Sequence, residues 1–422
     1  MKGPSPPTAT SGHPPYRLAM LPIADAFEHD YRGCEILYGR GRSSDLSAVL
    51  GDRGLDDALL VCGSNVGAND GLMGPIREGL GDRLAGVFDG TTPEKRVETA
   101  YDLLDKRAEV GADVLVAVGG GSSLDVARQA TMLDVDGRDL ADLRADAADG
   151  PDALGSLAPG TDPAIPLAVV PTTFAGADVS TGGSLEVLSA DASPTGQPMS
   201  VSGGQAMPIV DLADPALFET TPKSVLAGSA MNGFDKGVET PYARDATPVG
   251  DATAIHGLRL LSDALPRVAG NRESGEAAMD RAVVGALLVQ LNRRISVIHA
   301  FGHGFARRYD VQQGDVHAIV APHVLAYLFD EVDASRRALA DGLGVDTEGR
   351  DGQAIAEDVV AAVAAVRDAL PVPARLRDVP AIDENDFPAI AEYIAEDWCM
   401  DRAPAGLDAT PEAIEGVLRA AW

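Results

Sequence analysis

A few polar residues in the second half of the chain have the types and spacing that proton transfer requires. Asn232, Lys236 and Glu239 share a stretch in which residues three and four apart would lie on one helical face. His299 and His303 repeat the four-residue spacing downstream, within an otherwise apolar run. An amine and two imidazoles can stabilise a charged oxygen and move a proton, so these residues form the candidate reaction centre.

The sequence context of Lys236 leaves several roles open. Its positive charge could stabilise negative charge on a substrate oxygen. Burial lowers the pKa of a lysine, so the amine could instead be a general acid or a Schiff-base nucleophile. It could also do no more than form an ion pair with Glu239 or Asp235. For His299 and His303, the alternative is that they are core histidines with satisfied ring nitrogens.

Length and charge limit the class of protein. The chain has 422 residues, enough for two domains. Its 64 acidic and 34 basic residues give a net charge of −30, which would repel nucleic acid and acidic membranes, so we expect neither as a partner. No stretch approaches the roughly 20 apolar residues of a membrane helix. The three scattered cysteines fit a reducing compartment, and we expect a cytoplasmic protein.

Arginine supplies most of the basic charge, because the only lysines are Lys2, Lys95, Lys106, Lys223 and Lys236. This acidic, lysine-poor composition resembles that of proteins from salt-loving archaea. We therefore interpret the charge as adaptation to salt and not as a sign of function. The polar, proline-rich residues 1–15 are predicted to be a disordered tail and not a signal peptide.

The first half of the chain has the pattern of parallel strands joined by helices. The predicted elements are buried strands at Ala58–Cys62, Leu84–Phe88 and Val114–Val118, and a helix from Pro93 to about Val110. The last of these strands leads into a turn and a helix start made of Gly119, Gly120, Gly121, Ser122, Ser123 and Asp125. Glycines let a ligand approach the backbone, and a helix N-terminus attracts phosphate. This turn is a candidate nucleotide site, with an ordinary strand-to-helix turn as the alternative.

A second candidate contact follows the next predicted strand, Ile165–Val170, which comes after an acidic stretch at 133–160 that we interpret as a surface insertion. Thr172, Thr173 and Phe174 would lie at the carboxyl end of that strand. Threonines there can donate to a nucleotide lying across the edge of the sheet. Short strands with turns are expected within residues 182–212, as a hairpin excursion.

From residue 215 onward the pattern is helical. We predict a helix opened by Pro222 that carries Lys236, a break at Pro241, a helix at 251–265 ending before Pro266, and a long buried run at 276–307. Arg244 and Asp245 are interpreted as a surface or interdomain pair. The resulting division is a Rossmann-like nucleotide domain at 16–214 and an all-helical substrate domain at 215–422.

Several segments, taken in order, resemble the iron-containing (group III) alcohol dehydrogenase family. They are AVGGGSSLDVAR (117–128), PTTFAGADVSTGGS (171–184), the 32 residues beginning AMNGFDKGVE (230–261) and VIHAFGHG with VHAIVAPHV (297–324). The likeness is closest to the metal-independent maleylacetate reductase branch. It implies an α/β Rossmann-like domain followed by an all-α domain.

The resemblance also assigns roles. Gly119, Gly120, Gly121, Ser122, Ser123 and Asp125 would form the pyrophosphate loop, with Thr172, Thr173 and Phe174 toward the nicotinamide, so NAD or NADP is the implied cofactor. The residues that hold the metal ion in metal-dependent members correspond here to Asn232, Lys236, His299 and Gln313. Neutral amides and a lysine are poor ligands for zinc or iron, so we predict no catalytic metal.

We therefore predict a metal-independent NAD(P)-dependent oxidoreductase acting on a small alcohol, aldehyde or ketone. Lys236 would replace the metal cation, held by the amide oxygens of Asn232 and Gln313 in the substrate pocket, and His303 or His299 would relay the proton. The alternatives are a maleylacetate reductase-like enzyme on a carboxylated keto substrate, a dehydroquinate synthase-like cyclase, and a non-catalytic nucleotide-binding homologue. We also expect a homodimer or higher homo-oligomer, and the choice between NAD and NADP stays open.

Overall fold

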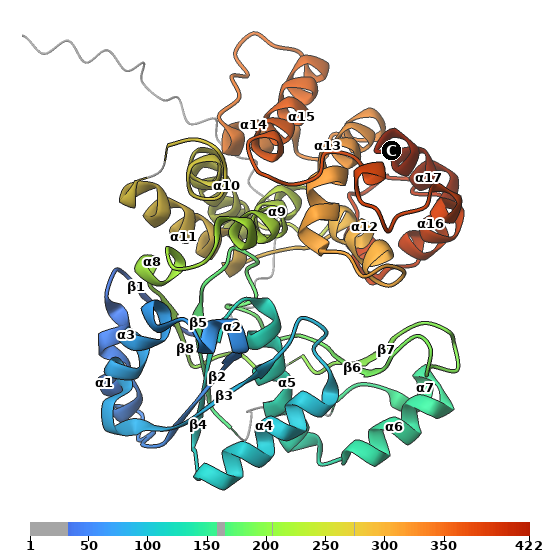
Figure 1. Ribbon diagram of the computed structural model, residues 1–422. Helices are drawn as coiled ribbons and strands as arrows, with labels where there is room; N and C mark the ends of the chain where they lie inside the picture. The colour runs from blue at the N-terminus through green and yellow to red at the C-terminus, as the bar shows by residue number, and fades with distance from the viewer. Residues whose placement is uncertain (1–32, 158–164, 205, 274) are drawn as a thin grey trace, which may run out of the picture.

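The computed structural model describes residues 33–157, 165–204, 206–273 and 275–422. It divides into a nucleotide lobe, the described residues up to 214, and a helical lobe, residues 215–422, which lie one above the other in Figure 1. The tail predicted at residues 1–15 lies outside the described residues. The fold predicted from the sequence, a Rossmann-like α/β domain followed by an all-α domain, is confirmed.

The nucleotide lobe is built on a parallel six-stranded sheet with the order β1-β8-β5-β4-β2-β3. Its strands are β1 (Glu35–Tyr38), β2 (Ala58–Gly63), β3 (Leu84–Thr91), β4 (Val114–Gly119), β5 (Leu167–Pro171) and β8 (Val210–Ala213). The central strands β2, β4 and β5 are almost entirely buried, because a parallel sheet covered on both faces has no solvent side. Each strand predicted from an apolar run is therefore present, with its ends moved by up to three residues.

Helices cover both faces of this sheet (Figure 1). One face carries α4 (Val97–Val110) and α5 (Gly121–Asp136), and the other carries α1 (Leu46–Gly51) and α3 (Asp70–Leu80), with the short α2 (Ser64–Gly67) after β2. Within the acidic stretch, α6 (Leu140–Asp149) and α7 (Pro151–Leu154) bury Leu143, Ala147 and Leu154 in the core beside α4 and α5. The acidic stretch thus contributes to the core of the lobe.

The segment 182–212 is only partly a hairpin. Strands β6 (Leu185–Leu188) and β7 (Met199–Val201) pair antiparallel as a separate two-stranded sheet. The third predicted strand of this segment is β8, which lies in the main sheet between β1 and β5. The sequence alternation was similar in all three strands, but β8 is buried on both faces, as a strand inside a parallel sheet must be.

The helical lobe packs its helices around one large apolar core. They are α8 (Pro215–Phe218), α9 (Lys223–Glu239), α10 (Pro248–Val268), α11 (Glu276–Leu291), α12 (Val297–Ala306), α13 (Gln313–Glu331), α14 (Arg336–Leu343), α15 (Gly352–Asp368), α16 (Phe387–Ala395) and α17 (Pro411–Ala420). Short 3₁₀ helices lie at η3 (Thr240–Tyr242) and η6 (Trp398–Arg402). Others lie directly before α1, β3 and α16, and one lies at Leu376–Asp378.

The long run predicted at 276–307 forms two helices, because residues 292–296 separate α11 from α12. Two predicted helix limits were wrong. Pro266 does not end α10, which continues to Val268. Helix α4 begins at Val97 and not at Pro93. The helix opened by Pro222 and the break at Pro241 are confirmed.

Helix α9 makes one of the contacts between the two lobes. The carbonyl oxygen of Phe174 lies so close to α9 that a Cβ atom added at Gly233 would be 2.0 Å from it. The Phe174 amide donates to Ser229 Oγ at 3.1 Å, and Thr221 Oγ1 donates to the Thr172 carbonyl at 2.9 Å. This helix therefore rests directly on the loop that follows β5.

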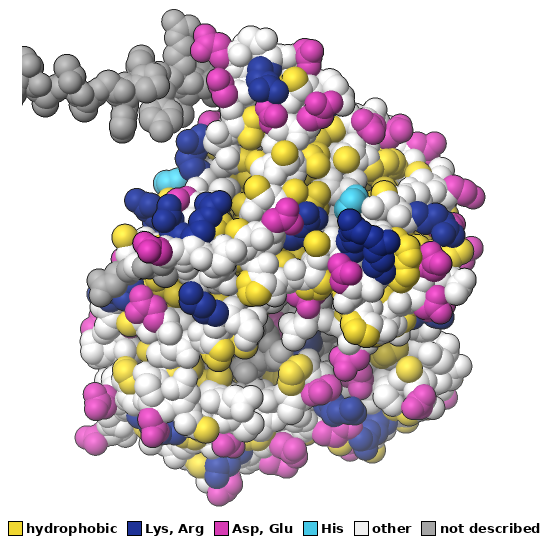
Figure 2. Space-filling model, turned by 45° about the horizontal axis from the view of Figure 1, so that its top comes forward, with side chains coloured by type: hydrophobic (Ala, Val, Ile, Leu, Met, Phe, Trp, Pro, Cys, Tyr) yellow, Lys and Arg dark blue, Asp and Glu magenta, His cyan; other side chains and the backbone are white. Residues whose placement is uncertain are grey.

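Acidic side chains are spread over the face seen in Figure 2, on both lobes, and do not gather in one patch. Among the described residues, no helix is both long enough and apolar enough to span a bilayer.

The close approach at Gly233 yields a stability prediction. Gly233→Ala should destabilise the protein by about 1 to 3 kcal/mol, because the added methyl must push α9 away from the Phe174 carbonyl. In the matched control Gly416→Ala, in exposed α17 with nothing within 4 Å of the added Cβ, stability should rise by about 0.5 to 1 kcal/mol. Thermal unfolding of the three proteins measures both effects, and an unchanged melting temperature for Gly233→Ala would contradict this packing.

Candidate active site

The glycine turn after β4 has the backbone shape of a ligand-binding turn. Gly119 has φ 131°, a conformation that side chains disfavour. A Cβ at Gly120 would be 3.2 Å from Thr173 Cγ2, so the backbone there lies close to the loop after β5. Helix α5 then begins at Gly121 without a side-chain cap, which leaves its first N–H groups without intrahelical partners.

The polar side chains that follow the turn are mostly bonded to other side chains of the protein. Ser123 is buried and shares a hydrogen bond of 2.6 Å with Thr91 Oγ1, while Ser122 is half-buried. Asp125 accepts from Lys95 Nζ at 3.2 Å and from Arg128 Nη1 at 3.0 Å. The predicted pyrophosphate loop is thus brought together, but the side chains of Ser123 and Asp125 already have protein partners.

The loop after β5 lies beside the glycine turn, as predicted. The Thr172 amide donates to the Gly119 carbonyl at 3.0 Å, which joins the two turns at the carboxyl edge of the sheet. Thr173 is half-buried, whereas Phe174 is 1% exposed and stacks on Phe218 with ring centroids 5.5 Å apart. The ring of Phe174 therefore belongs to the core, and its backbone amide and carbonyl face α9.

Lys236 lies beneath this same loop. Its Nζ donates to the carbonyl oxygens of Ala175 at 2.6 Å and of Gly176 at 2.8 Å. The residue is 7% exposed. Burial, and next the positive charge of Arg293, lower the pKa of the amine to about 7, although Asp178 acts in the opposite direction. Lys236 is thus a buried amine that changes protonation near neutral pH.

Asn232 and Gln313 do not hold the lysine as expected. Asn232 Nδ2 donates to Gln313 Oε1 at 3.3 Å, so the two amides bond to each other. The expected support of Lys236 by their oxygens is therefore wrong, and backbone carbonyls take that role. The ion pairs considered for Lys236, with Asp235 or Glu239, are not among the salt bridges of the described residues.

His299 is tied to Glu239 and is fully enclosed. Its Nδ1 makes a short hydrogen bond with Glu239 Oε2, and Glu239 Oε1 accepts from the backbone amides of Ser296 and His299, each at 3.0 Å. Burial raises the pKa of Glu239 to about 8 and lowers the pKa of His299 well below its usual value. The pair is therefore neutral, and Glu239 fixes the start of α12.

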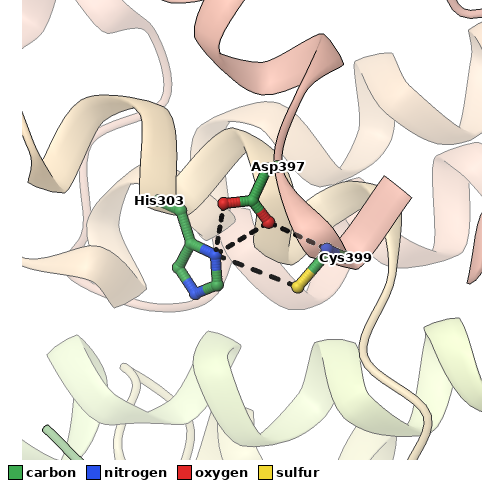
Figure 3. A group of neighbouring side chains, drawn as sticks. All are labelled: His303, Asp397 and Cys399. Carbon is green, nitrogen blue, oxygen red and sulfur yellow. Dashed lines mark hydrogen bonds and ion pairs between the residues drawn. The ribbon is translucent and has the colours of Figure 1, made fainter. Parts of the chain in front are cut away.

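His303 lies one turn further along α12 and is half-buried. Its Nδ1 is 3.1 Å from both carboxylate oxygens of Asp397, and Cys399 Sγ is 3.9 Å from the same nitrogen (Figure 3). Burial would raise the pKa of Asp397, but its hydrogen bond with His303 and the charge of that ring keep the pKa below its usual value. This arrangement holds the ring by Nδ1, which leaves Nε2 to meet a substrate.

Sequence reasoning missed the residues that support this site from a distance. Asp397 is 94 positions from His303 in the chain, and no local pattern relates the two. Gln290 lies in the last turn of α11, and its side-chain amide donates to the Val179 carbonyl at 3.2 Å. The carbonyl partners of Lys236 are main-chain atoms, so the residue types at positions 175 and 176 give no indication of them. Asp245 pairs with Arg294 and Arg402 and not with Arg244, so that predicted pair was also wrong.

The residues that the resemblance aligns with the metal position make a weak ligand set. Lys236 Nζ already donates to two carbonyl oxygens, and the other groups are two neutral amides and one imidazole, His299, whose Nε2 has no hydrogen-bond partner among the described residues. A nitrogen that donates cannot ligate until it loses its proton. Within the described part of the chain, one group has suitable ligand atoms within 4.8 Å of one another, namely His303, Asp397 and Cys399.

The turns after β4 and β5 do fit a dinucleotide. Gly119 has the positive φ of this turn, and the start of α5 offers N–H groups to a pyrophosphate. Two cavities lie between the lobes. One, of about 560 Å³, lies between Lys95 and Arg307, and the other, of about 310 Å³, lies between Val179 and Arg402.

Known proteins with this architecture were found by sequence and by structure. The model of the family described as iron-containing alcohol dehydrogenase matches residues 34–215, and the model of its C-terminal domain matches residues 226–422. A solved structure of 1,3-propanediol oxidoreductase superposes with a TM-score of 0.81 at 24% identity, covering 93% of this chain and 99% of that chain.

Curated relatives have a similar sequence identity to this chain. Lactaldehyde reductase of Escherichia coli (strain K12) is 26% identical, covering 91% of this chain and 97% of that protein. The NAD-dependent methanol dehydrogenase of Bacillus methanolicus is 25% identical, with coverages of 87% and 93%. The maleylacetate reductase of Pseudomonas knackmussii is 25% identical, with coverages of 94% and 97%. The family models extend over both lobes, and we conclude that the chain belongs to the iron-containing alcohol dehydrogenase family, as an oxidoreductase.

Proposed function

We propose that the protein is a metal-independent NAD(P)-dependent oxidoreductase that transfers hydride between the nicotinamide and a small alcohol, aldehyde or ketone. The cofactor assignment is supported by the dinucleotide-compatible turns after β4 and β5 and by a relative that is an NAD-dependent dehydrogenase. Metal independence is supported by the bonded state of the residues at the metal position. When bound, the cofactor supplies or accepts the hydride.

The observation that carries the proposal is the placement of Lys236 Nζ on the carbonyls of Ala175 and Gly176. These carbonyls directly follow the Thr172–Phe174 turn at the edge of the sheet, where open α/β folds bind their ligands. An ammonium group has three N–H bonds, and the two carbonyls take two of them. The third is left for the oxygen of a substrate.

Lys236 then acts as a titrating cation. As the carbonyl of a substrate is reduced, negative charge builds on its oxygen, and the third N–H of Lys236 stabilises that charge and transfers its proton. The neutral amine that remains still has two N–H bonds for the Ala175 and Gly176 carbonyls. Both protonation states are thus held in one position, which a pKa of about 7 makes accessible at neutral pH.

His303 is the proposed proton relay. Asp397 holds its Nδ1, so Nε2 is the nitrogen presented for proton exchange. His299, which we also considered for this role, is buried in the neutral pair with Glu239. We therefore assign His299 to positioning α12 and His303 to proton transfer.

Replacing Lys236 tests this role directly. Lys236→Met should lower kcat for carbonyl reduction by about 10² to 10³, because a donor aimed at the developing oxyanion is lost. In the wild type the protonated amine is the active form, so the rate of reduction should fall as pH rises through about 7. That limb should be missing from the pH profile of Lys236→Met.

The matched control is Lys106→Met, which removes a lysine paired with Glu109 on the surface of α4. It should keep the activity and the pH profile of the wild type. Affinity for the reduced cofactor, measured by its fluorescence, should persist in both variants. Full turnover by Lys236→Met would refute the cation role, and cofactor binding without turnover on any alcohol or carbonyl would identify a non-catalytic homologue.

Metal content gives an independent test. Protein purified after exposure to iron, zinc, manganese or nickel should contain no stoichiometric metal at the Lys236 position, and chelators should leave activity intact, because a lysine that keeps its proton, two neutral amides and one imidazole form a weak ligand set. A stoichiometric ion that is lost in Asn232→Ala would overturn the proposal. An ion lost only in Cys399→Ser would instead be assigned to His303, Asp397 and Cys399.

The neutral state of the Glu239–His299 pair yields a stability prediction. The folded-state pKa of Glu239, about 8, lies above its usual 4.5, so ionisation of the unfolded chain lowers stability as pH rises from about 4.5 to about 8. Glu239→Gln keeps an acceptor for the α12 amides and has no charge to bury. The stability of Glu239→Gln relative to the wild type should therefore increase across that range in denaturant titrations, and a difference independent of pH would show that Glu239 is ionised when folded.

A further inference from the structure

One cavity between the lobes concentrates positive charge in an otherwise acidic protein. It has a volume of about 310 Å³, and its walls come from the segment between α11 and α12, from η6 and from the loop after β5. Its lining includes Arg293, Arg294 and Arg402, and we call it the arginine cavity. The whole chain has 64 acidic residues against 34 basic ones, so this local excess is opposite to the general charge.

The guanidinium groups are only partly neutralised. Arg294 Nε and Arg402 Nε lie 3.1 Å and 3.2 Å from the same oxygen of Asp245, so one carboxylate serves two arginines. Arg293 donates to the Val179 carbonyl and to Ser180 Oγ, both at 3.0 Å, and these acceptors are neutral. Burial, and next the charge of Arg128, lower the pKa of Arg293 to about 10, so it stays charged at neutral pH.

Other carboxyl groups do not cancel this charge. The electrostatic partners of Arg293 include Asp178 and Asp125, which do not line the cavity. Asp125 is already bonded to Lys95 and Arg128, and burial raises the pKa of Asp178. With Asp245 counted, the lining therefore has more positive than negative charge.

The arginine cavity adjoins the proposed reaction centre at both ends. Gln290 lines the cavity at 1% exposure, and its buried Oε1 has no hydrogen-bond partner. A Cβ added at Gly176 would be 2.8 Å from that oxygen and 3.1 Å from Lys236 Nζ, so both atoms flank the same glycine. At the other end, the ring of Trp398 lies 6.0 Å from the ring of His303.

We infer that the arginine cavity binds an anionic group of the substrate, most simply a carboxylate, while the reacting carbonyl or alcohol carbon lies between it and Lys236. Planar guanidinium groups match the two oxygens of a carboxylate, and they bind sulfonates and phosphates by the same chemistry. The cavity volume suits a molecule of a few carbons. The substrate class is thus a short aldehyde or ketone with an anionic end, an inference that rests on the proposed oxidoreductase function.

The first test compares substrates that differ only in the charged end. Succinic semialdehyde should be reduced with a kcat/KM at least about tenfold higher than butanal, a neutral aldehyde of the same chain length, because a charged hydrogen-bonded contact is lost in butanal. The same comparison with sulfonate-ended and phosphonate-ended aldehydes identifies which anion is preferred. Equal or higher kcat/KM for butanal would overturn the inference.

Variants then assign the preference to the cavity. Arg402→Gln and Arg294→Gln should each reduce the ratio of kcat/KM for the anionic over the neutral aldehyde by about tenfold, mainly through KM. Arg281→Gln, which removes an exposed arginine of α11 paired with Asp263, is the matched control and should keep the ratio. An unchanged ratio in both cavity variants would also overturn the inference.

Direct binding separates this inference from the proposed function. Trp398 lines the cavity at 52% exposure, so titration with succinate should change its fluorescence in the wild type and much less in Arg402→Gln. The fluorescence change should disappear in Trp398→Phe, which would show that it comes from Trp398 and not from Trp422, the other tryptophan of the chain. If no aldehyde is reduced but succinate binds, the proposed function fails and the anion site stands. If aldehydes are reduced and succinate gives no signal and no inhibition, the anion site fails alone.

Discussion

The contact on which the site depends is the pair of hydrogen bonds from Lys236 Nζ to the carbonyls of Ala175 and Gly176. It joins α9 of the helical lobe to the loop that closes the nucleotide lobe. Gly233 lets the helix approach the Phe174 carbonyl, and Ser229 Oγ accepts from the Phe174 amide. A longer side chain at Gly233 or a missing amine at Lys236 would therefore disturb the same contact. The proposed reaction centre lies between the two lobes because this helix rests on this loop.

Under the proposed function, a lysine in place of a metal ion changes the electrostatics around it. A divalent ion would stabilise several nearby carboxylates at once, whereas one ammonium group with a pKa of about 7 provides at most one charge. The raised pKa values of the surrounding acids come mainly from burial, which raises the pKa of Asp235 well above its usual value and the pKa of Glu239 to about 8. Lys236 and Glu239 are thus two buried groups of the site whose pKa values lie near neutral, whereas the pKa of Asp397, which holds His303, lies below its usual value.

The sequence predicted the parts of the fold that depend on local pattern. Buried parallel strands are continuous apolar runs, so β2, β4 and β5 were found almost to the residue. The break between α11 and α12 was missed because apolar residues continue on both sides of it, and what ends the run is the bonding of the Ser296 amide to Glu239, 57 positions away. Helix α4 begins later than predicted because Pro93 lies in a turn and Arg96, just before the helix, forms a β-bridge with Glu186. Helix α10 continues for two residues beyond Pro266, so this proline lies within its last turn.

For the site, the sequence identified the residue types but not their partners. Lys236 and His303 were predicted from spacing, yet Lys236 is held by main-chain oxygens and His303 by Asp397, and neither partner has a local signal. The expected support of the lysine by Asn232 and Gln313 is not among the hydrogen bonds of the described residues, because the amine donates to two main-chain carbonyls while Asn232 Nδ2 donates to Gln313 Oε1.

The arginine cavity shows why net charge alone is a poor guide to substrate. A charge of −30 would repel an anionic substrate over long distances at low salt. At 1 M salt the Debye length is only about 3 Å, so the general field of the protein hardly reaches an approaching ligand. Under the inference drawn for this cavity, selection of the substrate then depends on groups within contact distance, namely Arg293, Arg294 and Arg402, two of which are bonded to the carboxylate of Asp245. An acidic surface and the inferred anion site are therefore compatible in one molecule, because salt screens the long-range repulsion from the surface more than it weakens the contacts inside the cavity.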